Sequence, residues 1–387
     1  MKAITVSQGQ QRSYQICTRC IMDTTDPNII FDVQGVCNHC HKYDRLIKSV
    51  VWNKEESDNR LQALVNQIKM AGKGKDYDCV IGVSGGVDST YVAHLTKQLG
   101  LRPLAIHMDN GWNSALAVTN IERTMKILGI DLYTEVLDWE EFRDLQLAFL
   151  KASTPDSEIP TDHAITAVLM QAAEKHKIKY ILTGSNIQSE GIMPAAWSQG
   201  IRDWKYIKSV HQQFGTVPLT TFPHFTLLDF ILAQTVKGQS WHNILNYVQY
   251  NKTEAMKVLQ EELGWVYYGG KHYESVYTRF FQSYILPLKF NADKRKGHLS
   301  TLVCSKEITR EVALQMLDEP ICLPEMLHDD KQFVIKKLGL TERTFDEIMA
   351  LPQKAISDYP AYENGLLLKG LRLIYRMPRA LRLAMAR

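Results

Sequence analysis

The sequence predicts an α/β protein built on a doubly wound parallel sheet, with a small cysteine-rich module before the sheet and a helical region after it. Three observations predict this architecture. Short runs of apolar, β-branched residues alternate with helix-length segments, a glycine-rich turn joins the first run to the first helix, and two Cys-x-x-Cys pairs fall within the first forty residues. At 387 residues the chain is long enough for two or three folded units.

The alternation sets the order of the expected elements. Residues 43–70 are expected to form a helical connector before the sheet. Strands are expected at 77–83, 102–109, 131–137 and 179–182, and helices at 89–99, 115–128, 138–151 and 161–176. This rhythm is typical of a parallel sheet with helices on both faces.

Changes in composition divide the chain into five segments. They are a cysteine-rich ribbon (1–45), a helical connector (46–75), the α/β domain (76–225), a basic segment (226–304) and a helical appendage (305–387). Residues 366–387 of the appendage alternate apolar residues with arginine and contain no acid, as a basic amphipathic helix does. A docking surface for an acidic protein, a peripheral membrane contact and a loosely ordered tail are all compatible with that pattern.

The four N-terminal cysteines have the spacing of a zinc site. Cys17-x-x-Cys20 and Cys37-x-x-Cys40 each form a knuckle with two thiolates, and four thiolates complete a tetrahedral Zn²⁺ shell with no open position. A structural zinc ribbon is therefore expected. An iron–sulfur cluster would use the same residues, and two disulfides are disfavoured in a chain without a secretion signal. The other cysteines stand singly in the sequence: Cys79, Cys304 and Cys322.

Charge and hydropathy argue against several classes of protein. The 45 basic and 42 acidic side chains nearly cancel, which disfavours a general nucleic-acid binder. The first residues lack the apolar core of a secretion signal, and no run approaches the roughly 20 apolar residues of a membrane span. A cytoplasmic protein is expected.

The glycine-rich turn has the features of a phosphate-binding loop. Two adjacent glycines let backbone N–H groups approach an anion, and the following helix directs the positive end of its dipole at the turn. A Walker loop is excluded because no lysine follows Gly86, and the remaining alternative is a plain strand–helix turn. The turn consists of Ser84, Gly85, Gly86, Val87, Asp88 and Ser89.

Two further strand ends carry polar residues that belong beside this turn. One contains Asp109 and Asn110, and the other contains Gly184 and Asn186. The carboxyl ends of parallel strands meet at one edge of the sheet, where ligands bind. Either segment alone is no more specific than a plain loop, but together with the glycine-rich turn they outline a nucleotide site.

Two downstream segments are candidates for binding a substrate. Residues 191–226 mix aromatic and basic side chains, as a lid over a sugar nucleotide or RNA would, although an ordinary ordered insertion has the same composition. Residues 271–298 are crowded with Lys, Arg and His, which suits phosphate or carboxylate binding but also a solvated basic face. Lys271, Arg279 and Lys294 are the candidate catalytic cations.

The pattern Ser-Gly-Gly-Val-Asp-Ser at 84–89 resembles the signature of the PP-loop ATP pyrophosphatases. The resemblance implies that ATP is split between its α and β phosphates at this turn. It also implies that Asp109 and Asn110 lie near the adenosine, and that Gly184 and Asn186 lie beside the α phosphate.

A magnesium ion is expected in such a site because the leaving pyrophosphate needs neutralising. Asp88 is the expected acid. The resemblance puts Glu190 where related enzymes often have a second magnesium ligand, but the local pattern Asn-Ile-Gln-Ser-Glu departs from the usual Asn-x-Asp-Glu.

The flanking motifs are similar to those of the N-acetyl sugar amidotransferases of bacterial surface-polysaccharide synthesis. They are Cys-Thr-Arg-Cys-Ile-Met-Asp at 17–23, Gly-Val-Cys-Asn-His-Cys at 35–40, Gly-Gly-Lys-His-Tyr-Glu-Ser at 269–275 and Asp-Lys-Arg-Lys-Gly-His-Leu-Ser at 293–300, with Gly297 where alanine is expected. The resemblance implies that the N-acetyl amide oxygen of a nucleotide-activated sugar is adenylated and that ammonia then replaces AMP. The product is an acetamidino sugar for LPS O-antigen or nonulosonic acid.

The ammonia is expected to come from another chain. A glutaminase needs a catalytic cysteine, but Cys17 is not N-terminal and no Gly-x-Cys-x-Gly elbow surrounds Cys79, Cys304 or Cys322. The resemblance implies a separate subunit similar to the glutaminase of histidine biosynthesis, with or without its cyclase-like companion.

Two rival functions stay open. A PP-loop tRNA thiolation enzyme also combines this turn with Cys-x-x-Cys pairs, but it needs a reactive cysteine or cluster near ATP and a more basic chain. A non-catalytic ATP-binding scaffold with a zinc ribbon requires fewer assumptions but leaves the basic segment without a role.

Overall fold

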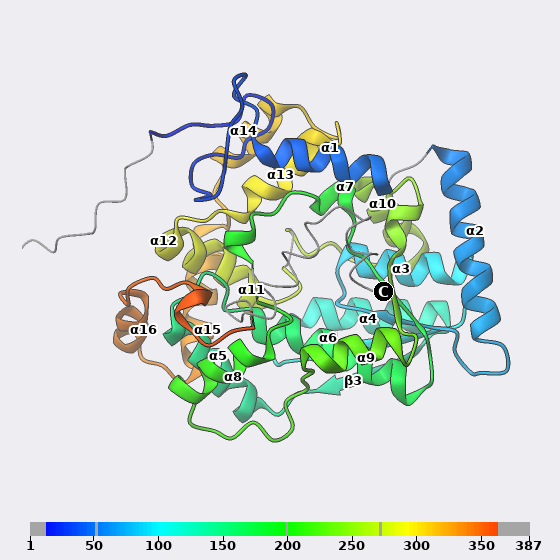
Figure 1. The fold of residues 1–387 in the computed structure, drawn as a ribbon. Helices are drawn as coiled ribbons and strands as arrows, with labels where there is room; N and C mark the ends of the chain where they lie inside the picture. Colours follow the sequence, from blue (N-terminus) through cyan, green and yellow to red (C-terminus); the bar gives the residue numbers. More distant parts are fainter. Residues whose placement is uncertain (1–12, 51–52, 199, 271–272, 363–387) are drawn as a thin grey trace, which may run out of the picture.

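The core of the fold is a five-stranded parallel sheet with the strand order β3-β2-β1-β4-β5 (Figure 1). The computed structural model describes residues 13–50, 53–198, 200–270 and 273–362. The strands are β1 (Cys79–Gly82), β2 (Pro103–Asp109), β3 (Asp131–Val136), β4 (Tyr180–Thr183) and β5 (Ser240–Asn243). The four strands expected from the sequence are confirmed. β5 was not expected, because Ser-Trp-His-Asn is a polar run that joins the sheet at its edge.

Helices cover both faces of the sheet, which confirms the doubly wound class. Successive strand residues point to opposite faces. Val80 shares a core with α5 (Trp139–Ala152) and α6 (Ile159–Lys175). Cys79 and Ile81 belong to the core on the other face. The helices there are α2 (Lys54–Ala71), α3 (Val87–Gln98), α4 (Ala115–Leu128) and α10 (Lys252–Leu263).

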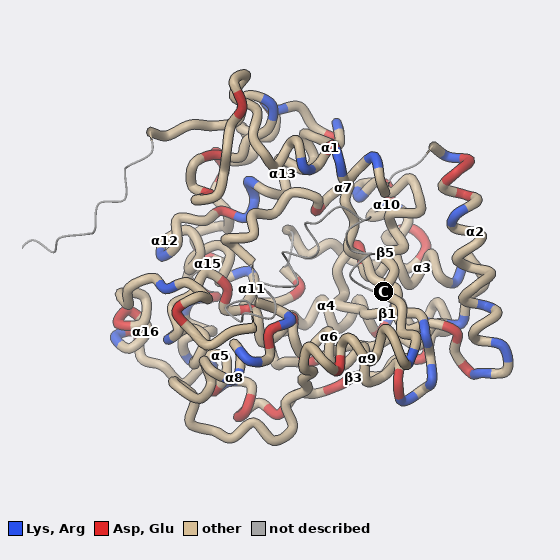
Figure 2. Tube along the Cα trace, viewed as in Figure 1, with Lys and Arg blue, Asp and Glu red and all other residues tan. Residues whose placement is uncertain are grey.

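Polar side chains cap several of the helices around the sheet. Ser114 accepts a hydrogen bond from the N–H of Ala117 at the start of α4, and Asp138 accepts one from Glu141 at the start of α5. The region of the expected helical connector holds two helices, α1 (Asn38–Val50) and α2, and the amide side chain of Asn53 caps the start of α2. Charged residues of both signs are spread along the chain, with α2 a clear example (Figure 2).

Short helices dominate the chain after β4. They are α7 (Ile187–Glu190), η1 (Ala195–Trp197), α8 (Trp204–Phe214), α9 (Leu227–Thr235), η2 (Ile244–Tyr247), α11 (Val276–Phe280), the π-helical η3 (Phe281–Ile285), α12 (Leu286–Phe290), α13 (Lys294–Cys304), α14 (Arg310–Asp318), α15 (Pro324–Leu338), α16 (Glu342–Met349) and η4 (Ile356–Asp358). The helical C-terminal region is thus confirmed as far as residue 362. The basic stretch 366–387 lies outside the described residues. Among the described helices, none is long and apolar enough to cross a membrane.

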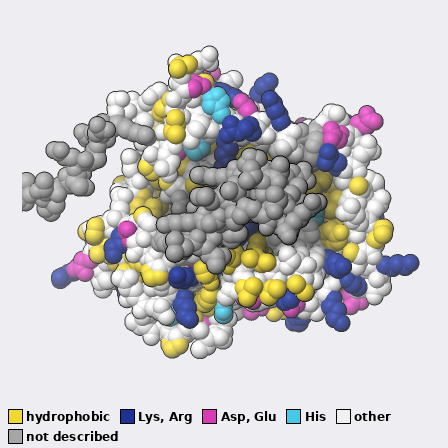
Figure 3. Space-filling model, in the orientation of Figure 1, with side chains coloured by type: hydrophobic (Ala, Val, Ile, Leu, Met, Phe, Trp, Pro, Cys, Tyr) yellow, Lys and Arg dark blue, Asp and Glu magenta, His cyan; other side chains and the backbone are white. Residues whose placement is uncertain are grey.

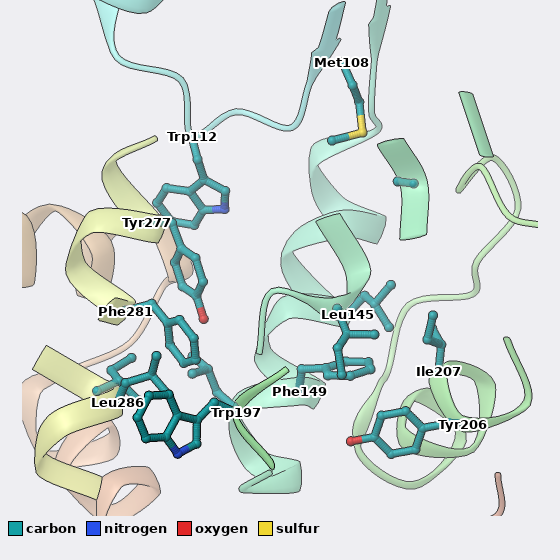
Figure 4. Packing of buried hydrophobic residues seen from close by; sticks show 14 of the residues in the cluster. Met108, Trp112, Leu145, Phe149, Trp197, Tyr206, Ile207, Tyr277, Phe281 and Leu286 are labelled. Atoms are coloured by element: carbon teal, nitrogen blue, oxygen red, sulfur yellow. The ribbon is translucent and has the colours of Figure 1, made fainter. Parts of the chain in front are cut away.

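A buried aromatic cluster joins the sheet to the C-terminal helices (Figure 4). Trp112, in the turn after β2, packs its ring 5.1 Å from that of Tyr277 in α11, and Tyr277 in turn stacks on Phe281 with ring centroids 6.1 Å apart. Trp112 and Tyr277 are each only 1% exposed. The C-terminal helices are therefore anchored beside the carboxyl end of β2.

Hydrophobic side chains also gather on the surface over α9 (Figure 3). Leu228 and Val236 are exposed there, together with Ile231 and Leu232. On the same helix, the ring of Phe230 lies 4.6 Å from the guanidinium carbon of Arg202. Because Arg202 lines the cavity described below, α9 borders that cavity.

Candidate active site

The glycine-rich turn closes on itself at the carboxyl end of β1. The hydroxyl of Ser89 accepts a hydrogen bond from the N–H of Ser84 and donates one to the carbonyl of Gly86, both over 3.2 Å. Gly85 has a φ of +80°, and a Cβ at this position would lie 2.7 Å from the carbonyl oxygen of Ala117. Only glycine fits there. Gly86 precedes α3 and supplies no side chain to cap it, so the turn is shaped as a backbone cradle.

Two residues from a segment far along the chain form hydrogen bonds to the backbone of this turn. The indole N–H of Trp265 donates to the carbonyl of Gly85 over 2.9 Å. The hydroxyl of Tyr268 is hydrogen-bonded to the backbone of Val87, and burial raises the pKa of that hydroxyl. Sequence reasoning missed both residues, because neither periodicity nor charge marks them.

The two acids expected to hold magnesium lie close to one tyrosine. The hydroxyl of Tyr250 donates a hydrogen bond to the carboxylate of Asp88. The pKa of Tyr250 is raised by burial, then by the negative charge of Asp88, and also by that of Glu190. A Cβ at Gly184 would lie 3.0 Å from the backbone of Asp88, so β4 also ends against α3. The two side chains offer the carboxylate oxygens that Mg²⁺ prefers.

These strand ends open into a cavity of about 760 Å³. Its lining includes some of the residues singled out by sequence: Ser84, Ser89, Asn110, Gly184 and Lys294. Other predicted residues lie outside the lining: Gly85, Gly86, Val87, Asp88, Asp109, Asn186, Glu190 and Arg279. Lys271 lies outside the described residues.

Several of the predicted nucleotide contacts shape the backbone of the site. The carboxylate of Asp109 accepts hydrogen bonds from the N–H of Gly111 (2.8 Å) and the amide of Asn113 (3.1 Å). Asn186 is 4% exposed, and its side-chain oxygen caps α7 by accepting from the N–H of Ser189 over 2.8 Å. Asn110 faces the cavity. These side chains hold the turns in which they stand.

Most cations of the basic segment are engaged with the protein itself. The guanidinium of Arg279 makes two hydrogen bonds, of 2.6 and 2.7 Å, to the carboxylate of Asp330. Arg295 donates to carbonyl groups at the end of α14, and Lys296 pairs with Asp23. Of its basic side chains, Lys294 and His298 line the cavity.

Three acids lie within electrostatic reach of Lys294. Burial raises the pKa of Asp162 to about 8, and the charges of Asp156 and Glu158 contribute to the rise. Burial lowers the pKa of Lys294, but the charges of the three acids outweigh it, so that the pKa is raised and the ammonium form is favoured. Asp162 and Glu158 line the cavity. Nothing in the sequence pattern pointed to this cluster beyond the expected start of a helix at residue 161.

A candidate metal centre lies in the N-terminal ribbon. The thiols of Cys17, Cys20, Cys37 and Cys40 are buried, and their sulfur atoms all lie within 4.8 Å of one another. This is the donor set of a structural Zn²⁺ site. The thiol of Cys304 in α13 is not isolated in space, because its sulfur lies 3.7 Å from that of Cys40. Nearby, the guanidinium of Arg310 donates to the carbonyls of Cys17 and Cys20, each over 3.0 Å, which ties the ribbon to α14.

The helices that meet the ribbon and the cavity are similar to a known family. Residues 274–374 match the family described as the C-terminal domain of WbpG-like LPS biosynthesis proteins. We call this part of the chain the WbpG-like domain. Its presence confirms the resemblance to proteins of bacterial surface-polysaccharide synthesis. The WbpG-like domain supplies Thr278 and Lys294 to the cavity and Arg310 to the ribbon. No curated protein matches the chain.

Three solved structures are similar to part of the chain. A predicted subunit of tRNA methyltransferase from Methanocaldococcus jannaschii is 16% identical, with 47% of this chain and 74% of that chain covered and a TM-score of 0.28. NMN synthetase from Francisella tularensis is 14% identical, with 55% and 87% covered and a TM-score of 0.28. The NH3-dependent NAD synthetase from Campylobacter jejuni is 16% identical, with 55% and 85% covered and a TM-score of 0.29. Because these TM-scores are low, we draw no conclusion about this protein from the three structures.

Proposed function

We propose that this protein is an ATP-dependent amidotransferase that converts the N-acetyl group of a nucleotide-activated sugar into an acetamidino group, in LPS O-antigen biosynthesis. One observation carries the proposal. The glycine-rich turn and the WbpG-like domain line the same cavity, with Ser84 and Ser89 on one side and Thr278 and Lys294 on the other. A cavity of about 760 Å³ has the size of a small-molecule site. The cavity combines a domain similar to LPS biosynthesis proteins with a loop shaped to bind phosphate. This combination favours a sugar as the acceptor of the nucleotidyl group.

The chemistry requires positioning and charge stabilisation more than a nucleophilic side chain. An amide oxygen is a poor leaving group, so it must first attack the α phosphate of ATP and become part of an adenylate. Pyrophosphate then leaves along the backbone cradle at Gly85 and Gly86. Mg²⁺ held by Asp88 and Glu190 would supply neutralisation of the pyrophosphate charge. Ammonia replaces AMP in the second step.

The cysteines favour a separate source of ammonia. All seven cysteines are described, and none of them lines the cavity. We therefore propose a separate glutaminase subunit similar to that of histidine biosynthesis, with or without a cyclase-like companion. The same observation disfavours tRNA thiolation, which needs a reactive cysteine near ATP. Use of ATP and a nucleotide-activated sugar fits a cytoplasmic protein.

The test is to follow AMP and pyrophosphate release from labelled ATP by the purified full chain, with ammonium chloride and Mg²⁺. Release that depends on a member of a panel of UDP-linked N-acetylhexosamines and related N-acetyl sugars, with formation of an amidine detected by mass spectrometry, is the expected result. Release that depends on tRNA would support the thiolation enzyme instead. Binding of ATP without release under any of these conditions would support the scaffold.

A further inference from the structure

The proposed reaction has a proton step to which no residue has yet been assigned. Attack of the amide oxygen on ATP leaves the amide N–H in place, so the adenylated intermediate is a cationic imidate. Ammonia donates its lone pair to the imidate carbon, forming a C–N bond. The C–O bond then breaks and its electron pair leaves with AMP. The new nitrogen must lose one proton before the product is a singly charged amidinium, and a group in the cavity has to accept that proton.

Asp162 is placed to accept it. It lies in the first turn of α6 and lines the cavity. The sequence suggests that Thr161-Asp162 starts a helix, but α6 begins earlier, at Ile159, so that Asp162 is not needed as a cap. Within the described part of the chain, its carboxylate takes part in no hydrogen bond or ion pair, which leaves it available to a ligand.

The neighbours of Asp162 form a pocket that favours a small cation or N–H donor. Asp156 is only 3% exposed, and its Oδ2 atom is buried without a hydrogen-bond partner among the described residues. Asp156 is not among the residues that line the cavity, so it acts on Asp162 through its charge. Glu158 accepts a hydrogen bond from the hydroxyl of Thr278 over 2.5 Å. Asp156, Glu158 and Asp162 all act electrostatically on the ammonium group of Lys294.

We propose that Asp162 is the catalytic carboxylate that takes the proton from the attacking ammonia, and that Glu158, which also lines the cavity, helps to receive that ammonia beside it. The assignment rests on the proposed function. The charged groups that face Asp162 are Asp156 and Glu158, from the segment before α6, and Lys294, from α13. Burial raises the pKa of Asp162 to about 8, which is near the working pH of a general base in the cytoplasm. Its proton then passes to solvent after the product has left.

The test separates adenylation from the ammonia step. Sugar-dependent exchange of labelled pyrophosphate into ATP, measured without ammonia, reports adenylation alone. Amidine formation with ammonium chloride reports both steps. Asp162→Asn keeps the size of the side chain but cannot accept a proton, so it should retain exchange within about twofold and lose roughly 100-fold or more of amidine formation. Asp162→Glu, which keeps the carboxylate, should restore part of the lost rate.

Glu140→Gln is the matched control, because Glu140 also lies in the first turn of a helix, α5, but is exposed and outside the cavity lining. It should change neither readout. Unchanged amidine formation in Asp162→Asn would overturn the inference alone, as would a parallel loss of exchange and amidine formation. Absence of sugar-dependent exchange in the unaltered protein would overturn the proposed function, and this inference with it.

Discussion

The ammonium group of Lys337 in α15 donates a hydrogen bond to the carbonyl of Gly111, in the turn after β2. The same ammonium lies 5.1 Å from the ring of Trp112 and 4.9 Å from that of Trp139. A helix of the WbpG-like domain therefore holds the turn that carries Asn110, a residue of the cavity lining. The C-terminal helices thus act on the cavity in two ways, through residues of its lining and through the turn after β2.

Replacing Lys337 tests this connection. Lys337→Met removes the hydrogen bond and the cation–π contacts while keeping an apolar stem, and should lower the free energy of unfolding by about 1–3 kcal/mol. It should also raise the ATP concentration needed for half-maximal turnover. Lys336→Met is the control, since Lys336 is the exposed neighbour on the same helix. Equal urea midpoints for the two variants would contradict the role given to Lys337.

Much of the fold could be predicted because its signals are local. β1 and β2 are buried apolar runs, and α4 begins after a capping serine, Ser114, and ends before Gly129 in the left-handed conformation. β5 gave no such signal, because its polar residues are ordered by pairing with β4 rather than by their own preference.

The candidate site was only partly predictable because its contacts are not local. The glycine-rich turn can be recognised from its own residues. Trp265 and Tyr250, which hydrogen-bond to it, lie more than 150 positions away in the sequence. The density of cations in the basic segment does not reveal that Arg279 is paired with Asp330. Whether a cation is free for a substrate depends on partners that only the fold brings to it.

The zinc ribbon can be tested by comparing two cysteines. Cys37→Ser removes one of the four sulfur ligands and should abolish stoichiometric zinc and lower the melting temperature. Cys304→Ser changes a thiol only 3.7 Å from Cys40 that is outside the set of four, and should keep zinc. Zinc is measured by atomic emission after dialysis. Full zinc content in Cys37→Ser, or its loss in Cys304→Ser, would show that the ligand set is different.

Asp88 is expected to be essential for splitting ATP. Asp88→Ala removes the acid beside Glu190 and should reduce AMP formation by at least about 1,000-fold, because the pyrophosphate charge is then left without its metal. Tyr250→Phe removes only the hydroxyl that donates to Asp88 and should reduce AMP formation by about tenfold. Zinc content should be unchanged in both variants. Turnover retained by Asp88→Ala would rule out the assigned site.

Alanine substitutions at Gly85 and Gly129 distinguish the effect of backbone strain from the effect of steric crowding. Both have positive φ, +80° and +57°, but a Cβ at Gly85 would lie 2.7 Å from the Ala117 carbonyl, whereas nothing lies within 4 Å of one at Gly129. Gly129→Ala should therefore cost only the conformational strain of about 1 kcal/mol. Gly85→Ala should cost more and should also weaken ATP binding, measured by calorimetry. Similar ATP affinities for the two variants would indicate that the cradle does not hold the phosphates.

The pH dependence of stability provides a test of Asp162 that does not require a substrate. Its pKa is raised from 3.8 to about 8 in the folded protein, mainly by burial, so the folded state binds a proton that the unfolded state releases. The stabilisation from this group is fully present below about pH 4 and is lost as the pH rises through about 8. The loss amounts to at most about 1.4 kcal/mol per pH unit. Asp162→Asn cannot ionise, so the variant should gain stability relative to the unaltered protein as the pH rises from 5 to 8. Urea titrations at four pH values measure this difference, and a difference that stays constant with pH would mean that Asp162 has an ordinary pKa in the folded protein.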